Sequence, residues 1–368
     1  MRETDCDTLG SPEPFFRFSA QRLWRDLEGR GFVARIPAND LNCVFYLYPD
    51  EASAKSGEKL GGSGFWVAID SPNVPNHHWL FGVSNKHVVH KISATVIRAN
   101  ARSSGIFTYP TEPTDWIEHP GGHDIAILVV GYANIVPHIE LVTIPQEMFV
   151  IEQHVQDETV GLGDDVYMIG RFVNHEGRQR NIPSVRFGNI SMLPGEPIYI
   201  DAKTRAQESF AVELRSMCGY SGSPVFVEVG GVQRRHGGTS MGPPRQLFLG
   251  VHWGHILEPW TVEKYIQPAR TTALRPGEKE IELVQANTGM NGVVPAWRLR
   301  EMFNLPAIRD ALRRDEEADL ERRKRENPGA KLDAAVVAQR PPDDDANPNH
   351  LADFTRLVDV AARKKPKD

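Results

Sequence analysis

Between about residues 41 and 300, the chain is a succession of short β-branched and aromatic runs that glycine, proline and asparagine interrupt. This spacing constrains the fold most, because many short strands at such intervals are typical of a β-sandwich or a β-barrel. At 368 residues the chain has room for about two folding units, which in an all-β protein can be two halves of one domain. Six runs are expected to be strands: Cys43–Tyr48, Gly64–Ile69, Asp124–Val130, Asp165–Ile169, Ser223–Val229 and Leu247–Val251.

Helical patterns flank this β-rich part on both sides. Apolar residues at helical spacing predict a short amphipathic helix, Ala20–Leu27, within an N-terminal segment 1–40. After Pro295 the apolar period becomes helical again over 296–312, with an interruption at Pro306. We expect this second helical segment to dock on the β-core and to close the domain.

The segment 313–368 has a different composition from the rest of the chain. Thirteen basic and 13 acidic residues fill it, and Phe354 is its only aromatic residue. Such a segment cannot form a core of its own, so we expect a charged tail that is partly helical or disordered. The run 313–327 favours a solvent-facing helix with i,i+4 charge pairs, and docking of a regulatory protein is the alternative.

Composition and charge exclude several classes of protein. The net charge of −6 argues against a chain that binds nucleic acid mainly through phosphates. No window approaches the roughly 18 apolar residues of a membrane span, and the N-terminus has no signal-peptide pattern. The three cysteines, Cys6, Cys43 and Cys218, suit neither a disulfide framework nor a zinc site. We therefore expect a cytoplasmic protein without nucleic-acid or membrane partners.

Three motifs follow one another inside the β-rich part and carry the chemistry. They are SNKHVV at Ser84–Val89, HDIAIL at His123–Leu128 and GYSGSP at Gly219–Pro224. The residues His87, Asp124 and Ser221 occur in that order, with gaps of 37 and 97 positions. Each motif alone is a weak signal, but together they resemble the trypsin/chymotrypsin-like serine peptidases.

The residue types fit nucleophilic catalysis. A serine hydroxyl needs a nearby imidazole to take its proton, and the imidazole needs a buried carboxylate that fixes its tautomer. Ser221, His87 and Asp124 would fill these roles. Gly219 allows a tight turn, so that the backbone N–H groups of Gly219 and Ser221 can form an oxyanion hole. No metal or cofactor is needed for this reaction.

Further segments extend the resemblance over roughly residues 41–305, including the motif Gly163–Gly170, which is similar to Deg-type bacterial members. It implies two antiparallel six-stranded barrels within a peptidase domain 41–312, divided near 140–160, with the active site in the cleft between them. We expect no PDZ module after the peptidase domain, because the segment after residue 312 is too short and too charged.

The resemblance also implies a substrate-binding strand, formed by His252, Trp253 and Gly254. His252 either supports Asp124 or merely packs, and Trp253 either lines the specificity pocket or belongs to the core. Arg215 lies six residues before Ser221, where the resembling enzymes have the floor of this pocket. A guanidinium there would favour cleavage after Asp or Glu, and a position facing solvent is the alternative.

These observations predict a regulated serine endopeptidase that acts on a protein or peptide substrate through an acyl-enzyme. A first alternative is an inactive binding scaffold, in which Tyr220 or His252 blocks the site. A second is an adaptor whose tail recruits partners. Tyr220 also stands where digestive zymogens have an aspartate, so activation by a new N-terminus is not expected.

Overall fold

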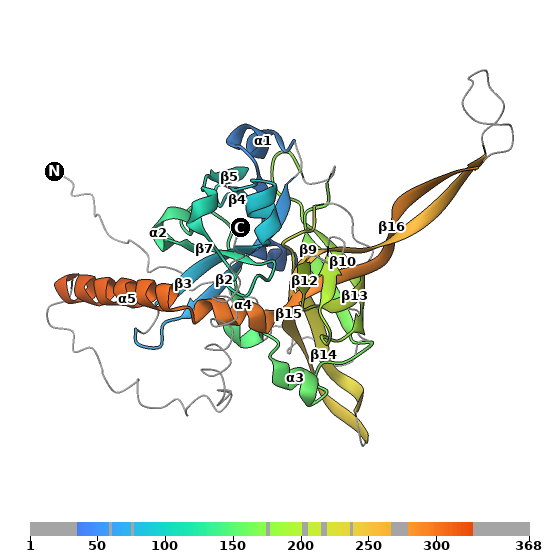
Figure 1. The fold of residues 1–368 in the computed structure, drawn as a ribbon. Helices are drawn as coiled ribbons and strands as arrows, with labels where there is room; N and C mark the ends of the chain where they lie inside the picture. Colours follow the sequence, from blue (N-terminus) through green and yellow to red (C-terminus); the bar gives the residue numbers. More distant parts are fainter. Residues whose placement is uncertain are drawn as a thin grey trace, which may run out of the picture.

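The computed structural model describes residues 35–58, 61–74, 77–173, 177–200, 205–214, 219–235, 238–265 and 279–326. The predicted helix Ala20–Leu27 lies outside these residues, as does the part of the tail after Glu326. Two β-rich units lie side by side. Of the two helices near the C-terminal end of the described chain, the first lies next to their junction, and the second extends away from it on the side of the first unit (Figure 1).

The first unit is an eight-stranded sheet. Its strands run in the order β5-β4-β1-β2-β3-β7-β6, and β8 pairs in parallel with β2. The bounds are β1 (Val44–Tyr48), β2 (Gly62–Asp70), β3 (His78–Ser84), β4 (Val96–Asn100), β5 (Ile106–Tyr109), β6 (Trp116–Glu118), β7 (Ala126–Val130) and β8 (Ile144–Pro145). Strands β1 to β3 are buried on both faces, which explains why they read as continuous apolar runs rather than alternating ones.

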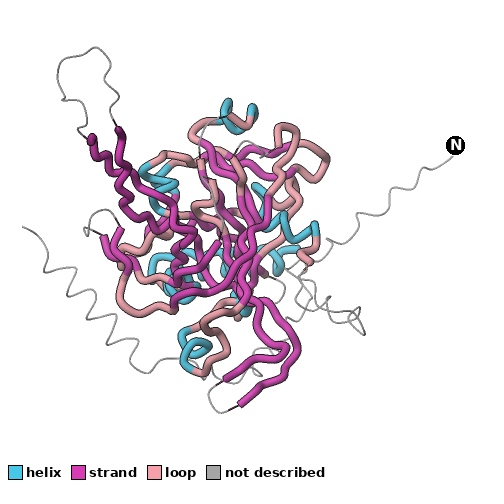
Figure 2. Tube along the Cα trace, turned by 90° about the vertical axis from the view of Figure 1, so that its right-hand side faces the viewer, coloured by secondary structure: helices cyan, strands magenta, loops and turns pink. Residues whose placement is uncertain are grey.

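The second unit is a closed antiparallel barrel in the order β10-β13-β16-β15-β14-β9. Its strands are β9 (Asp165–Gly170), β10 (Ser184–Met192), β13 (Phe210–Leu214), β14 (Pro224–Arg235), β15 (Gly238–Tyr265) and β16 (Lys279–Pro295). Strands β15 and β16 continue past the barrel as a two-stranded ribbon, which projects from the body in Figures 1 and 2.

The remaining elements are short. They are the hairpin β11 (Ile198–Ile200) and β12 (Arg205–Gln207), the helices α1 (Glu51–Ser56), α2 (Tyr132–Ile135) and α3 (Glu152–Gln156), and the 3-10 or π-helical turns Ala38–Cys43, His87–Lys91, Pro113–Asp115 and Gln146–Met148. The chain is all-β in class, with the chymotrypsin-like two-unit arrangement that the sequence predicts. The second unit is the expected six-stranded barrel, whereas the first is a half-barrel sheet of eight strands.

An aromatic cluster joins the two units. The rings of Phe65 on β2 and Phe248 on β15 have centroids 5.2 Å apart, and Phe149 in the connection lies 4.8 Å from Phe248. Phe303, at the end of α4 (Ala296–Phe303), completes the cluster, and its ring centroid lies 4.8 Å from that of Phe81 on β3. Because all of these rings are buried, they fix how the barrel sits against the sheet.

Polar contacts reinforce the same junction on another side. The buried Arg98 on β4 donates from Nη2 to the carbonyl oxygens of Gly177 and Arg178, at 2.9 and 2.8 Å. Asn181 donates from its backbone N–H to Asn100 Oδ1 at 2.7 Å. The loop between β9 and β10 is therefore bound to the first sheet, which matters because the candidate site lies between the units.

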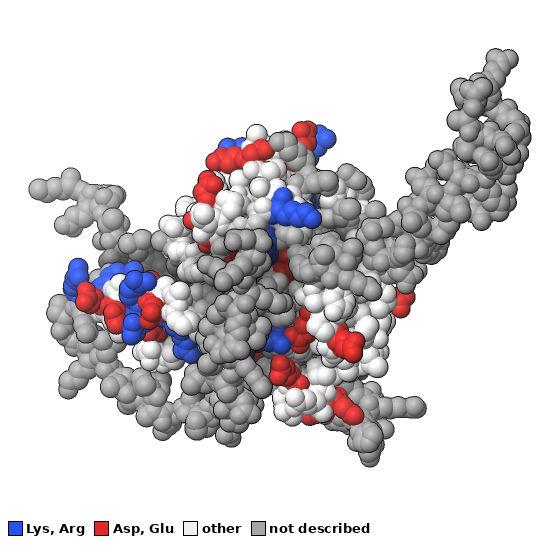
Figure 3. All heavy atoms as spheres, viewed as in Figure 1, with Lys and Arg blue, Asp and Glu red and all other residues white. Residues whose placement is uncertain are grey.

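The C-terminal helices are α4 (Ala296–Phe303) and α5 (Pro306–Glu326), so the chain leaves the helix before Pro306 and starts a new one with proline in the first turn. On α5, Ile308 and Leu312 are buried. The space-filling view shows basic and acidic side chains next to each other on this helix (Figure 3).

Two acidic residues continue the buried stripe of α5 beyond Leu312. Glu316 accepts hydrogen bonds from Ser71 and from Asn73 Nδ2, and Asp319 lies 3.3 Å from His77 Nδ1. Both carboxylates therefore face the turn between β2 and β3. The part of the charged tail that the structure describes is helical, and one of its faces packs on the first sheet.

Candidate active site

His87 and Asp124 meet because of the register of β3 and β7. Ser84, the last residue of β3, pairs with Ala126, the first residue of β7. His87 and Asp124 lie just beyond this end of the strand pair, in the two loops that leave it. Strand register alone thus brings together two residues that are 37 positions apart.

The pair is in hydrogen-bonding geometry. His87 Nδ1 lies 2.6 Å from Asp124 Oδ2, and the backbone N–H of His87 donates to Asp124 Oδ1 at 2.9 Å. The Asp124 side chain is only 1% exposed, whereas that of His87 is 19% exposed. A buried carboxylate that faces one ring nitrogen leaves the other nitrogen free to serve as a base.

The backbone of Asp124 is held from two sides. Asn85 donates from Nδ2 to the carbonyl oxygen of Asp124 at 2.7 Å. The N–H of Asp124 donates at 2.9 Å to Oε1 of Gln207, which is in β12, in the hairpin between the barrel strands β10 and β13. Both supporting side chains are buried.

Ser221 stands on a tight loop between two glycines of positive φ. Gly219 has φ +101° and Gly222 has φ +84°, values that side chains rarely allow. A Cβ atom on Gly222 would lie 2.1 Å from the carbonyl oxygen of Ser63. The loop packs so closely on β2 that glycine is required there by both space and backbone conformation.

Ser63 on β2 ties this loop to the first sheet. Its N–H donates to the carbonyl oxygen of Ser221 at 2.8 Å, and its hydroxyl donates to the carbonyl oxygen of Gly219 at 2.8 Å. The same hydroxyl accepts a hydrogen bond from the N–H of Arg171 at 2.9 Å. The half-buried Ser221 is thereby fastened to the unit that carries His87 and Asp124.

Tyr220 and His252, the residues that could block the site, are both buried. The Tyr220 hydroxyl contacts Ser184 and accepts from Arg186 Nε at 3.0 Å, so it lies on the β10 side of the barrel. His252 Nδ1 lies 3.1 Å from the carbonyl oxygen of Tyr220, and its Nε2 lies 3.1 Å from Asn291 Oδ1. Burial lowers the pKa of His252 to about 4, so the ring is neutral at pH 7.

The other residues of the predicted substrate strand differ in their surroundings. Trp253 is 6% exposed, and its Nε1 donates to Ser209 Oγ at 2.5 Å, which fits the core interpretation of this side chain. Gly254 is half-buried on β15. Arg215 lies outside the described residues, so the prediction of acidic specificity stays a prediction.

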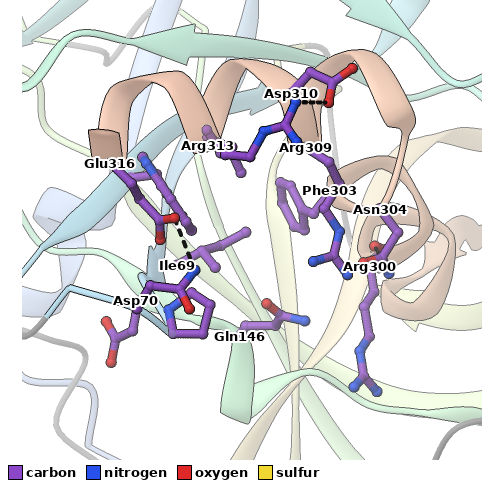
Figure 4. Close-up of a pocket in the computed structure, with 14 residues that line it drawn as sticks. Ile69, Asp70, Gln146, Arg300, Phe303, Asn304, Arg309, Asp310, Arg313 and Glu316 are labelled. Atoms are coloured by element: carbon purple, nitrogen blue, oxygen red, sulfur yellow. Dashed lines mark hydrogen bonds and ion pairs between the residues drawn. The ribbon is translucent and has the colours of Figure 1, made fainter. Parts of the chain in front are cut away.

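A cavity elsewhere in the molecule is lined by none of the described residues of the candidate site. It holds about 490 Å³ and lies between the β2–β3 turn and the two C-terminal helices (Figure 4). Arg300, Arg309 and Arg313 line it together with Gln146 and Glu316.

Two residues that support the candidate site, Ser63 and Gln207, were not predicted from the sequence. Ser63 comes directly before the expected strand Gly64–Ile69, and nothing in the sequence indicates that its hydroxyl donates to the carbonyl oxygen of Gly219. Gln207 lies in a segment without a motif.

The described residues contain no group of three or more His, Cys, Asp or Glu side chains that could hold a metal ion. No helix among them is long and apolar enough to cross a membrane.

Comparisons with known proteins give fold neighbours only. No family model matches the chain, and no curated protein matches it. Among solved structures, the MamO protease domain from Magnetospirillum magneticum is 14% identical, with a TM-score of 0.39, over 72% of this chain and 97% of that one.

Two further structures align in the same range. The inactive form of the Rv3671c protease is 16% identical, with a TM-score of 0.38, over 73% of this chain and 90% of that one. The NS6 protease from murine norovirus 1 is 12% identical, with a TM-score of 0.32, over 71% and 94%. At such scores the likenesses carry no argument about activity, so the function rests on the geometry of the site.

Proposed function

We propose that this protein is a serine endopeptidase in which Ser221 is the nucleophile, His87 the general base and acid, and Asp124 the residue that orients His87. The observation that carries the proposal is the contact of 2.6 Å between His87 Nδ1 and the buried carboxylate of Asp124. This contact supports a tautomer in which Nε2 of His87 is available to take the proton of a serine hydroxyl.

The reaction would proceed in two halves. Ser221 Oγ attacks the carbonyl carbon of the scissile peptide bond while His87 takes its proton, and the tetrahedral intermediate then expels the amine, which receives that proton. Water hydrolyses the acyl-enzyme with His87 acting again as base. We assign stabilisation of the oxyanion to the N–H groups of Gly219 and Ser221, because Gly219 adopts the positive φ that a tight loop needs.

Burial of Tyr220 and His252 disfavours the alternative of an inactive scaffold. The Tyr220 hydroxyl is engaged with β10, and the buried ring of His252 lies between the Tyr220 carbonyl oxygen and Asn291 Oδ1. Neither side chain is therefore free to occupy the position of a substrate. The proposal also includes binding of a peptide or protein substrate at Gly254 on β15. It further includes docking of a regulatory protein on the C-terminal tail.

A fluorophosphonate probe tests the proposal directly, because it reacts with a serine that a working triad activates. The wild-type chain is expected to be labelled, and mass spectrometry of the digested protein should place the adduct on Ser221. Ser221→Ala is expected to remain unlabelled, and Ser191→Ala, which removes an exposed serine of β10, should label like wild type. An unlabelled, folded wild-type protein would contradict the proposal and favour the scaffold.

A further inference from the structure

Gln207 connects the second unit to the backbone of Asp124. It is the last residue of β12, in the hairpin inserted between β10 and β13, and its side chain is 1% exposed. Its Oε1 accepts from the N–H of Asp124 at 2.9 Å. Its Nε2 donates to the carbonyl oxygen of Glu208 and lies 2.8 Å from Nδ1 of His123.

Only one orientation of this amide satisfies all three contacts. If the oxygen and nitrogen of Gln207 were exchanged, an NH₂ group would face the N–H of Asp124, and an oxygen would face the carbonyl of Glu208. The actual orientation requires His123 Nδ1 to accept a hydrogen bond, so the ring must be neutral. Burial, with a further contribution from His119, lowers the pKa of His123 to about 3, in agreement with this requirement.

The segment that carries Gln207 is itself anchored. The carboxylate of the next residue, Glu208, accepts from Arg298 Nε at 2.5 Å and from Trp297 Nε1 at 3.3 Å. Both donors belong to α4, whose apolar face is part of the core. The segment that carries the Gln207 amide is therefore anchored to α4.

The position of the Asp124 backbone determines the geometry of its carboxylate. Both carboxylate oxygens are engaged by His87, one with the ring and one with the backbone N–H. Asn85 binds the carbonyl of Asp124 from the first sheet, and Gln207 binds its N–H from the second unit. A small rotation of the Asp124 peptide would change the contact with the His87 ring, on which the base depends.

We propose that Gln207 is a positioning residue for the reaction: its amide fixes the backbone of Asp124 from the barrel side, so that the carboxylate meets the His87 ring in line. The role rests on the proposed serine-peptidase function. Gln207 itself touches neither substrate nor the reacting atoms. It acts through Asp124, and it makes the alignment of the His–Asp pair depend on the packing of the two units.

The test compares Gln207→Leu with Gln153→Leu, which makes the same change at an exposed position on α3. Hydrolysis of a peptide substrate gives kcat and KM, and NMR gives the low-field resonance of the proton between His87 Nδ1 and Asp124 Oδ2. Gln207→Leu is expected to lower kcat by about tenfold to hundredfold, with KM within about twofold, because a buried N–H loses its acceptor. Its low-field resonance should shift or broaden, while Gln153→Leu matches wild type in both measurements.

Gln207→Asn provides the second variant, because it keeps the amide but is shorter by one methylene and cannot reach Asp124. It is expected to show the same loss of kcat and the same change in the resonance, and it carries the test if leucine prevents folding. Folded variants with wild-type kcat and an unchanged resonance would overturn the inference.

The two proposals fail in different ways. If wild type does not react with the fluorophosphonate probe, the proposed function is wrong, yet the NMR comparison still shows whether Gln207 aligns His87 with Asp124. If wild type is active and the Gln207 variants match the control, the function stands and the positioning role is wrong.

Discussion

The two halves of the candidate site are held by different kinds of contact. His87 and Asp124 follow from the register of adjacent strands in one sheet, since Ser84 pairs with Ala126 and both residues lie just past that pair. Ser221 stands on a loop of the barrel, and its position depends on hydrogen bonds from Ser63 across the junction of the units. The difference teaches that strand register in one sheet brings His87 and Asp124 together, whereas the position of the Ser221 loop beside them depends on contacts across the junction of the units.

Single substitutions of His87 and Asp124 are expected to reduce activity most. His87→Ala should reduce kcat/KM by about 10⁶-fold, while Asp124→Asn should leave a trace of activity at about 10⁴-fold below wild type, because the acid only orients and stabilises the ring. Steady-state hydrolysis of a peptide measures both. Circular dichroism should show both variants folded, and equal activities of the two would contradict the assigned roles.

A substitution in the Ser221 loop tests whether the position of this loop depends on its contact with the first sheet. Gly222→Ala is expected to reduce activity by at least about a hundredfold and to lower the free energy of unfolding by about 2 to 4 kcal/mol. The reason is the φ of +84° and the approach of 2.1 Å to the Ser63 carbonyl. Gly195→Ala, at a glycine with open space, is the matched control. Wild-type kinetics and stability in Gly222→Ala would show that the loop is not fastened as described.

Ser63→Ala removes a single interface contact and should act more mildly. Its hydroxyl holds both the Gly219 carbonyl and the Arg171 N–H, so its loss should lower kcat by about tenfold. The low-field resonance of His87 and Asp124 should not change, because the hydrogen bonds of the Ser63 hydroxyl go to Gly219 and Arg171 and not to this pair. A changed resonance would mean that the contact between His87 and Asp124 also depends on Ser63.

The smallest effect is expected far from both halves, at Asp40. Burial raises the pKa of this carboxyl to about 6, above its ordinary value of 3.8. The folded chain therefore holds the proton more tightly than the unfolded chain, and this contribution to stability is lost as the pH rises from about 4 through 6. Asp40→Asn should raise the free energy of unfolding by about 1 to 2 kcal/mol at pH 8 and leave it unchanged at pH 4.

Urea denaturation at the two pH values measures this difference, with Glu147→Gln as a control at an exposed carboxylate. Peptide hydrolysis by Asp40→Asn should equal that of wild type, since Asp40 lies in the turn before β1. A stabilisation that is the same at both pH values would mean that burial of the charge is not its cause.

The residues of the candidate triad could be predicted from the sequence. The motifs around His87, Asp124 and Ser221 identify the candidate triad, because these residue types and the glycines beside Ser221 are demanded by the reaction and by the turn. Six strands, β1, β2, β7, β9, β14 and β15, could be predicted as well, since β-branched and aromatic runs between turn residues are a local signal. The helical break at Pro306 follows from the ring of proline.

The supporting contacts could not be predicted in this way. Gln207 lies 83 positions from Asp124, and Ser63 lies 156 positions from Gly219, so neither pair leaves a pattern in any sequence window. Glu316 reads as one more charge on a solvated helix, yet it is 5% exposed and binds the β2–β3 turn. The tertiary structure also decided that Tyr220 belongs to the barrel interior.

Sequence by itself determined the all-β class, six of the strands and the residue types of the candidate triad, because period, turn chemistry and reactivity are properties of a few neighbouring residues. Only the tertiary structure decided which side chains hold Asp124 and the Ser221 loop in place. Hydrogen bonds between units form only after both units have folded and packed, and their partners are selected by proximity in space rather than by spacing along the chain.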